Sequence, residues 1–285
     1  MKQAVWKDYR VLATGDGQKL EKWGDVYLLR PDPQVIWHAK RDLLHLAPLN
    51  AKYVAEGKVG EKWEYLRNVP DSFCVSWQDL TFSLKLMKGF KHTGLFPEQA
   101  ANWQVMMQLI QNAKRPISVL NLFAYTGGAT LACLRAGASV THVDAATAMV
   151  QRAKENAKLS HLDEKPCRYI IDDCAKFVAR EIRRGRQYDA IIMDPPSFGR
   201  GPNGELWKIE TSLDDLLALC SQVLSPDPLF VLINSYTTGL QPTVIKNLLS
   251  IHFGRPGCKA DAYEVTLPTD EGLDLPCGCS GLMTY

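Results

Sequence analysis

The sequence lacks every kind of long apolar run. Its first ten residues, MKQAVWKDYR, contain no apolar stretch of the length that a signal peptide needs, and no later run approaches the roughly 20 apolar residues of a membrane-spanning helix. We therefore expect a cytoplasmic protein with no membrane partner.

The chain also lacks a strong excess of charge of either sign. Its 33 basic and 31 acidic side chains leave a formal charge of +2. A protein that holds nucleic acid mainly by releasing counterions is strongly basic. Any contact with nucleic acid is therefore expected to come from a local patch.

Metal-binding patterns are missing as well. The eight cysteines show no CxxC spacing, and the six histidines form no HxxxH motif and no cluster with cysteine. We therefore predict no metal site, and we expect the thiols to be reduced.

The sequence that is present divides into two parts. Residues 1–90 mix short alternating runs, such as DVYLLR and FCVSW, with turn-forming stretches, which predicts a small, mostly β module. Substrate binding is the expected role of this module. Residues 91–285 alternate strand-like and helix-like segments, which predicts an α/β domain built on a parallel sheet. The tail, residues 261–285, alternates in polarity and predicts a closing pair of strands.

Nine segments of the second part carry a clear pattern. The predicted strands are residues 117–123, 139–145, 167–173, 188–194 and 228–235. The predicted helices, whose apolar positions recur at intervals of three and four, are residues 127–137, 146–160, 173–185 and 212–224.

Candidate ligand residues follow four of these strands. Gly127–Gly128 follows the first, and Asp144, Asp173 and Asp194 end the next three. In a doubly wound sheet the ligand lies at the carboxyl ends of the strands. FAYTGGAT lacks the GxGxxG pattern of a dinucleotide site, whereas one carboxylate can accept hydrogen bonds from both hydroxyls of a ribose. The order of residues therefore predicts a nucleoside ligand, although a glycine pair alone is typical of a tight turn and a lone aspartate of a helix cap.

These strand ends, together with the DPPSF stretch at residues 194–198, resemble the class I S-adenosylmethionine-dependent methyltransferases. HTGLFPEQ, NLFAYTGG, HVDAA and DPPSFGRG together resemble the bacterial family that includes the large-subunit ribosomal RNA cytosine-C5 methyltransferases and their relatives. The likeness covers about residues 91–285, and the β module resembles that family's middle domain. It implies a Rossmann-like, seven-stranded class I methyltransferase sheet, S-adenosylmethionine as cofactor and RNA, most of all ribosomal RNA, as substrate.

The same resemblance implies roles for particular residues. The methionine part of the cofactor would be surrounded by Phe96, Pro97, Gln99, Phe123, Ala124, Tyr125, Thr126, Gly127 and Gly128. Asp144, beside Ala145, would hold the ribose; Asp173, beside Cys174, would hold the adenine amino group; and Asp194, Pro195 and Phe198 would serve the reaction. Phe123 and Tyr125 fit a core position equally well. Asp172 is favoured as the cap of the helix that begins at Cys174, with Asp173 as the ligand.

The chemistry depends on the acceptor atom. Enzymes that methylate cytosine C5 attack C6 with a cysteine thiolate, but Ser235 and Tyr236 stand where the C5-methylating relatives carry that cysteine. Cys277 and Cys279 lie in the predicted closing pair of strands, from which one of them would have to reach the site. A nitrogen acceptor needs no covalent intermediate, because Asp194 and the Pro195 carbonyl can hold it while Phe198 stacks on a flipped base. N-methylation of RNA is therefore favoured over C5-methylation.

Two other functions stay open. The chain fits a small-molecule or protein methyltransferase, since the cofactor domain says little about the acceptor, and a non-catalytic relative that binds RNA or cofactor. A common face for six basic residues would favour RNA: Lys40, Arg41, Lys52, Lys85, Lys88 and Lys91. The chain begins directly at the β module, without the PUA-type domain that the family often carries, so we expect RNA affinity to depend on assembled substrate or on a homodimer.

Overall fold

The structure is a computed structural model that describes residues 3–56, 60–200 and 206–285. Its described residues divide into two compact units, one of Ala101–Val265 with Gly278–Tyr285 and one of Gln3–Ala100 with Thr266–Cys277. The predicted division between residues 90 and 91 falls inside the second unit.

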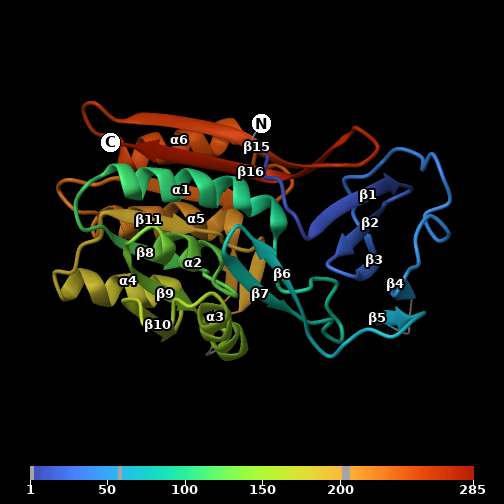
Figure 1. The fold of residues 1–285 in the computed structure, drawn as a ribbon. Coiled ribbons are helices and arrows are strands. Elements are labelled where there is room, and N and C mark those ends of the chain that lie inside the picture. The colour runs from blue at the N-terminus through green and yellow to red at the C-terminus, as the bar shows by residue number, and fades with distance from the viewer. Residues whose placement is uncertain (1–2, 57–59, 201–205) are drawn as a thin grey trace. The chain divides into compact units, whose positions relative to one another are not determined.

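A seven-stranded sheet forms the centre of the first unit, in the order β10-β9-β8-β11-β14-β16-β15 (Figure 1). Five strands are parallel: β8 (Ser118–Leu122), β9 (Ser139–Asp144), β10 (Cys167–Ile171), β11 (Ala190–Met193) and β14 (Phe230–Ser235). β16 (Asp274–Thr284) runs antiparallel to β14, with β15 (Lys259–Pro268) beside it. The predicted Rossmann-like sheet and its closing pair of strands are confirmed.

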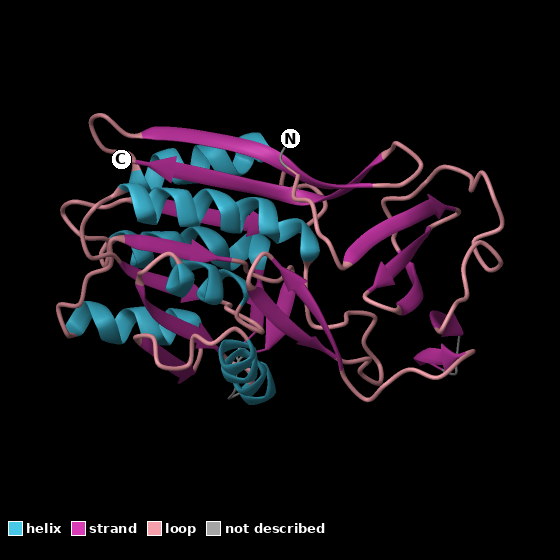
Figure 2. Ribbon diagram, viewed as in Figure 1, coloured by secondary structure: helices cyan, strands magenta, loops and turns pink. Residues whose placement is uncertain are grey.

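Helices cover both faces of this sheet (Figure 2). Helices α4 (Cys174–Arg183), α5 (Ile209–Ser221) and α6 (Pro242–Phe253) share one hydrophobic core with Leu120 and Leu122 of β8. Because successive strand residues point to opposite faces, Asn121 points the other way and contacts Thr130 of α2 (Gly128–Arg135). Helices α1 (Ala100–Asn112) and α3 (Thr147–Leu159) lie with α2 on that face. The sequence patterns predicted α2 to α5 but not α1 or α6.

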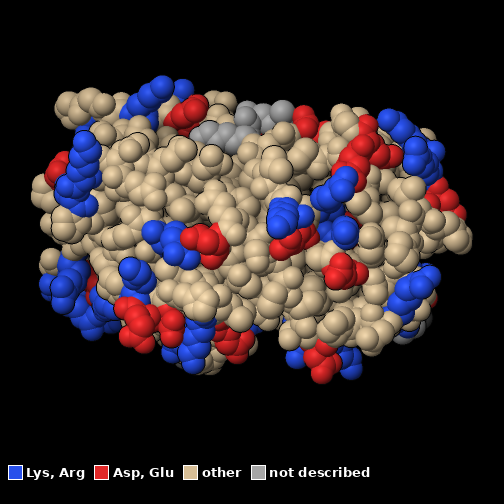
Figure 3. All heavy atoms as spheres, in the orientation of Figure 1, with Lys and Arg blue, Asp and Glu red and all other residues tan. Residues whose placement is uncertain are grey.

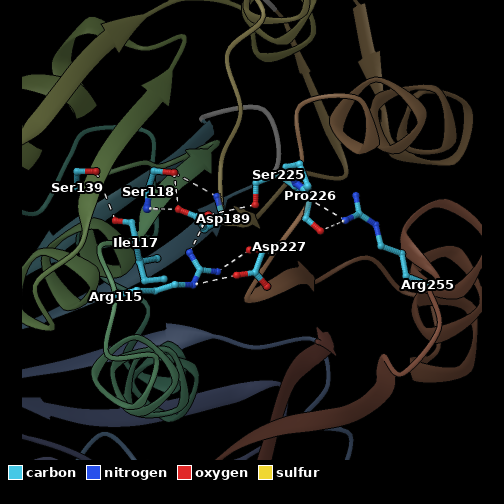
Figure 4. Close-up of polar contacts among 9 residues, drawn as sticks. All are labelled: Arg115, Ile117, Ser118, Ser139, Asp189, Ser225, Pro226, Asp227 and Arg255. Carbon is cyan, nitrogen blue, oxygen red and sulfur yellow. Dashed lines mark hydrogen bonds and ion pairs between the residues drawn. The ribbon is translucent and has the colours of Figure 1, made fainter.

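A polar network ties the sheet together at the amino ends of its strands (Figure 4). Asp189, just before β11, accepts hydrogen bonds from the backbone N–H and the hydroxyl of Ser118, both at 2.8 Å. It also accepts from Arg115 at 3.0 Å and from the hydroxyl of Ser225 at 3.1 Å. Burial alone would raise the pKa of Asp189, but these bonds outweigh it and hold the pKa below its ordinary value. The network fixes the edge of the sheet opposite the predicted ligand edge.

The second unit is mostly β structure, as predicted for its N-terminal part. Its five-stranded sheet comprises β1 (Tyr9–Gly15), β2 (Gln18–Trp23), β3 (Val26–Pro31), β4 (Ala51–Glu56) and β5 (Gly60–Tyr65), in that order, and β6 (Phe73–Trp77) pairs with β7 (Leu80–Leu84). In its interior Glu21, fully buried, forms a bidentate ion pair with Arg30 at 2.5 and 2.8 Å and accepts a bond from Tyr9. Each buried charge is therefore compensated.

Candidate functional site

The turn after β8 is the most unusual stretch of backbone in the first unit. Phe123, Tyr125 and Gly127 all have positive φ angles, of 54°, 49° and 88°. For the two aromatic residues this conformation costs on the order of 1–3 kcal/mol and persists only where the surroundings fix it. Here the Phe123 N–H donates to the sulfur of Cys174 at 3.4 Å, and the Tyr125 N–H donates to the carboxylate of Asp144 at 2.8 Å. Bonds within the protein thus hold the turn in this conformation.

The two positions of the turn, 127 and 128, are glycine for different physical reasons. Gly127 supplies the left-handed conformation that precedes α2. A Cβ on Gly128 would lie 2.4 Å from the indole ring of Trp103 in α1, so this position must be glycine to let the two helices pack. The sequence argument assigned Gly128 to close approach of a ligand and did not anticipate Trp103. Ala124 and Thr126 are buried; the Ala124 N–H donates to Val143, and the Thr126 carbonyl accepts from Asn156.

Asp144 ends β9 next to this turn. Its two carboxylate oxygens each accept one backbone N–H, from Tyr125 at 2.8 Å and from Ala146 at 2.9 Å. A carboxylate has about four lone-pair sites, so each oxygen keeps accepting capacity. Burial raises the pKa of Asp144, and the two hydrogen bonds offset only part of this. The side chain is oriented and can still accept a ligand's hydroxyls; Ala145 beside it is half-buried.

The roles predicted for the two aspartates after β10 need a correction. Asp173, not Asp172, caps α4, because its side chain accepts the N–H of Lys176 at 2.9 Å. Asp172 instead forms an ion pair with Arg180, which lies one helical turn beyond Lys176. The prediction that Asp172 is the cap was therefore wrong. Binding of an adenine amino group by Asp173 stays a prediction, and only one oxygen of Asp173 is used by the cap.

The DPPSF stretch leads from β11 into a short hairpin. Asp194 lies at the carboxyl end of β11, where its N–H donates to Leu122 of β8 at 3.4 Å. β12 (Phe198–Arg200) then pairs with β13 (Leu206–Lys208). Pro195 is buried, whereas Phe198 is 56% exposed. Asp194 thus shares an edge of the sheet with Asp144 and the glycine turn.

Two side chains that the sequence patterns did not single out hold this stretch. The indole N–H of Trp207 donates to the Pro196 carbonyl at 2.6 Å, and its ring lies 5.1 Å from that of Phe123. The hydroxyl groups of Ser197 and Thr237 form a hydrogen bond at 2.6 Å, and Thr237 follows β14. The sequence did contain a signal for the hairpin that carries Trp207, since the turn-forming GPNG at residues 201–204 separates two short strand-like runs. It contained none for the contact that Trp207 makes.

The end of β14 shows what stands in place of a nucleophilic cysteine. Ser235 is directly opposite Cys279 of β16. The Cys279 thiol is buried and donates to the Leu240 carbonyl at 3.1 Å, and burial raises its pKa, with Glu264 adding to the effect. A reactive thiolate needs the opposite, a lowered pKa. Cys220 is fully buried in the core of α5.

Phe96, Pro97 and Gln99 belong to the second unit. Pro97 and Gln99 form the 3-10 helix η2 (Pro97–Gln99), and the Pro97 carbonyl accepts the indole N–H of Trp6 at 2.9 Å. The ring of Phe96 lies 5.1 Å from that of His92. Their role around a cofactor stays a prediction.

Known proteins share this architecture. A family model described as S-adenosylmethionine-dependent methyltransferase matches residues 50–231. The chain belongs to the S-adenosylmethionine-dependent methyltransferases. Over its whole length it superposes on the crystal structure of a SAM-dependent methyltransferase from Agrobacterium tumefaciens, with a TM-score of 0.93, 30% identity and 92% of that chain covered. A putative SAM-dependent methyltransferase from Streptococcus mutans has the same fold at 20% identity, with a TM-score of 0.76 over 99% of this chain and 76% of the other.

Curated relatives match a part of this methyltransferase. It is 29% identical over 158 residues to ribosomal RNA large subunit methyltransferase I of Aliivibrio fischeri, which is 55% of this chain and 38% of that protein. It is 32% identical over 157 residues to ribosomal RNA large subunit methyltransferase K/L of a Shewanella species, which is 54% of this chain and 21% of that protein. The matched segment thus spans well under half the length of these relatives.

The residues of the first unit fit the family's cofactor, S-adenosylmethionine. The carboxylate of Asp144 is the acceptor that a ribose diol requires, and it is held in place by backbone bonds on both oxygens. The turn at Phe123–Gly127 keeps its conformation through bonds within the protein. Among the described residues no cluster of three or more His, Cys, Asp or Glu side chains is suited to a metal ion, and each described helix is too short or too polar to cross a bilayer.

Proposed function

We propose that this methyltransferase modifies a nitrogen atom of an RNA base, with ribosomal RNA as the substrate. The observation that carries the proposal is the DPPSF stretch at the end of β11, with Asp194 at the carboxyl end of the strand and an exposed Phe198, beside a β14 end that offers serine instead of cysteine. The names of the curated relatives, both ribosomal RNA methyltransferases, support the choice of substrate.

The residues of the stretch suit a nitrogen acceptor. When bound, S-adenosylmethionine supplies a methyl group, which forms a bond to the acceptor nitrogen as its bond to sulfur breaks. The Asp194 carboxylate and the Pro195 carbonyl accept hydrogen bonds from the acceptor amine and so direct its lone pair, and the proton that the nitrogen loses passes to solvent. Phe198 stacks on the extruded base, an interaction worth about 1–3 kcal/mol. Positioning is the protein's main contribution, because an in-line displacement depends on near-attack geometry.

The state of Cys279 supports nitrogen over carbon. This thiol is opposite Ser235 at the end of β14, but it is buried, donates to a carbonyl and has a raised pKa. Addition to cytosine C6 needs a thiolate, and a thiol in these surroundings stays protonated at neutral pH. A nitrogen acceptor avoids this requirement.

Charge favours local contacts with RNA over a broad electrostatic field. Basic and acidic side chains are interspersed on the face drawn in Figure 3. Two of the six basic residues considered for a patch are engaged within the protein: Lys52 pairs with Glu64 at 3.3 Å, and Lys91 donates to the Pro31 carbonyl at 3.4 Å. The six therefore do not form one free patch. A homodimer that completes the RNA site, and a cytoplasmic location, remain part of the proposal.

Transfer of labelled methyl to total RNA from cells that lack this protein tests the proposal. We expect label in ribosomal RNA from these cells and none in RNA from cells that contain the protein, whose sites are already methylated. Binding of S-adenosylmethionine together with labelling of a protein or small-molecule fraction, and not of RNA, would contradict it. Binding of RNA without any transfer would instead indicate a relative that has lost the chemistry.

A further inference from the structure

The hairpin of β12 and β13 has two different faces. Opposite residues of an antiparallel pair share a face, and successive residues along a strand alternate. The register sets Gly199 opposite Trp207 and Phe198 opposite Lys208. Trp207 therefore lies on one face of the hairpin, which we call the inner face. Phe198, Leu206 and Lys208 lie on the other, which we call the outer face.

The inner face is fixed to the site. Trp207 donates to the Pro196 carbonyl at 2.6 Å and packs against Phe123 of the turn after β8. The N–H of Ile209, directly after the hairpin, donates to the Ser197 carbonyl at 3.1 Å. These contacts join the β13 end of the hairpin to the DPPSF stretch, and β12 continues directly from that stretch, so the position of the outer face is set by the site itself.

The outer face combines exposed apolar groups with a cation. Phe198 is 56% exposed and Leu206 is 53% exposed, and Lys208 is exposed as well. Side chains of this kind suit single-stranded nucleic acid, because an aromatic ring stacks on the face of a base, an aliphatic side chain buries apolar surface against an exposed base, and a lysine pairs with a phosphate. Phe198 belongs to this face, and its proposed partner is the target base. A neighbouring nucleotide would therefore meet Leu206 and Lys208.

We propose that the outer face of this hairpin binds the RNA strand that flanks the target base, with Leu206 against the adjacent base and Lys208 at a phosphate. This inference rests on the proposed function, since it assumes an RNA acceptor. It assigns to Leu206 and Lys208 a role in substrate affinity and none in cofactor binding.

Two substitutions with matched controls test the inference. Leu206→Ser removes an exposed apolar group, and Ile251→Ser does the same in the last turn of α6, at the opposite edge of the sheet. Lys208→Gln removes an exposed charge, and Lys165→Gln does so in the loop before β10, also at the opposite edge. All four side chains lie at the surface or half-exposed, so we expect folded protein in each case, to be checked by thermal unfolding.

Fluorescence anisotropy with a labelled single-stranded RNA of about 12 nucleotides gives Kd at several salt concentrations, and methyl transfer to ribosomal RNA is measured in parallel. Leu206→Ser should raise Kd for RNA about fivefold. Lys208→Gln should reduce the slope of log Kd against log salt by about 0.7, the value for one lost phosphate contact on a single strand. Both controls should match wild type, and Kd for S-adenosylmethionine should be unchanged throughout.

The outcomes separate the two proposals. If wild type methylates ribosomal RNA but Leu206→Ser and Lys208→Gln behave like their controls, the hairpin inference is overturned and the proposed function stands. If wild type transfers methyl to no RNA, the proposed function fails and the inference fails with it.

Discussion

Replacing Asp144 with asparagine perturbs the proposed cofactor site at a single atom. In the folded chain, its carboxylate oxygens accept one N–H each, from Tyr125 and from Ala146. An amide replaces one of these oxygens with an NH2 group. Whichever way the amide is turned, its NH2 group faces one of the two backbone N–H donors. The lost charge-assisted bond costs about 1.5–3 kcal/mol, and relief of the buried charge returns part of it, so we expect unfolding free energy to fall by about 1–2 kcal/mol.

The effect on cofactor binding should be larger. The carboxylate can accept from both ribose hydroxyls, and an amide oxygen oriented by the same surroundings keeps at most one of these bonds. A loss of about 2–3 kcal/mol corresponds to a Kd that rises roughly 30- to 150-fold. Calorimetric titration with S-adenosylmethionine measures Kd, and urea unfolding measures stability. Asp163→Asn, an exposed acid in the loop before β10, serves as control. A folded Asp144→Asn protein with Kd within threefold of wild type would refute the assignment.

Binding should also depend on pH through Asp144. Because burial raises its pKa, the side chain takes up a proton at a higher pH than an ordinary aspartate does, and the protonated form accepts hydrogen bonds less well. Cofactor affinity of wild type should therefore fall on acidification, and the fall should begin at a higher pH than the titration of an ordinary aspartate would give. The Asp144→Asn variant should show a flatter profile; a parallel profile would mean that another group titrates.

Three further predictions follow from the same structure. Asp173→Ser keeps a side chain that caps α4 well, so stability should change by less than about 0.5 kcal/mol while Kd for S-adenosylmethionine rises about tenfold; unchanged Kd would remove Asp173 from the cofactor site. Trp207→Phe keeps the aromatic contact but deletes the bond to the Pro196 carbonyl, so steady-state kinetics should show kcat lowered about tenfold with the cofactor KM within twofold of wild type, and a KM changed as much as kcat would refute a positioning role. Asp189→Asn should lower unfolding free energy by about 2–3 kcal/mol in urea titration. Because the folded pKa of Asp189 is lowered, its contribution is present above about pH 4 and is lost as the pH falls through that lowered pKa, so the difference between variant and wild type should shrink in acid.

Local patterns were sufficient for the parallel part of the sheet. Each of its five strands is a short run rich in apolar residues, and four of them end in, or are closely followed by, a candidate ligand residue that the parallel arrangement brings to one edge. The placement of Asp144 beside the glycine turn was predicted in this way, because both follow adjacent parallel strands. The closing strands were predicted from alternation alone.

The remaining features depend on contacts between distant segments. Gly128 is required by Trp103, and the DPPSF stretch is held by Trp207; neither pairing can be read from residue spacing. The choice between Asp172 and Asp173 was decided by Arg180, which attracts the first carboxylate and leaves the second to cap α4. Helix α1 has no charged residue to mark its polar face, and its pattern was overlooked.

The most direct test of the account is nucleoside analysis of the RNA that this protein labels with methyl from S-adenosylmethionine, carried out with wild type and with Cys279→Ser. The account predicts a base methylated on nitrogen, and the same product from the variant. Labelled 5-methylcytosine that disappears on the Cys279→Ser change would contradict it, because that result would require the buried thiol to act as the nucleophile.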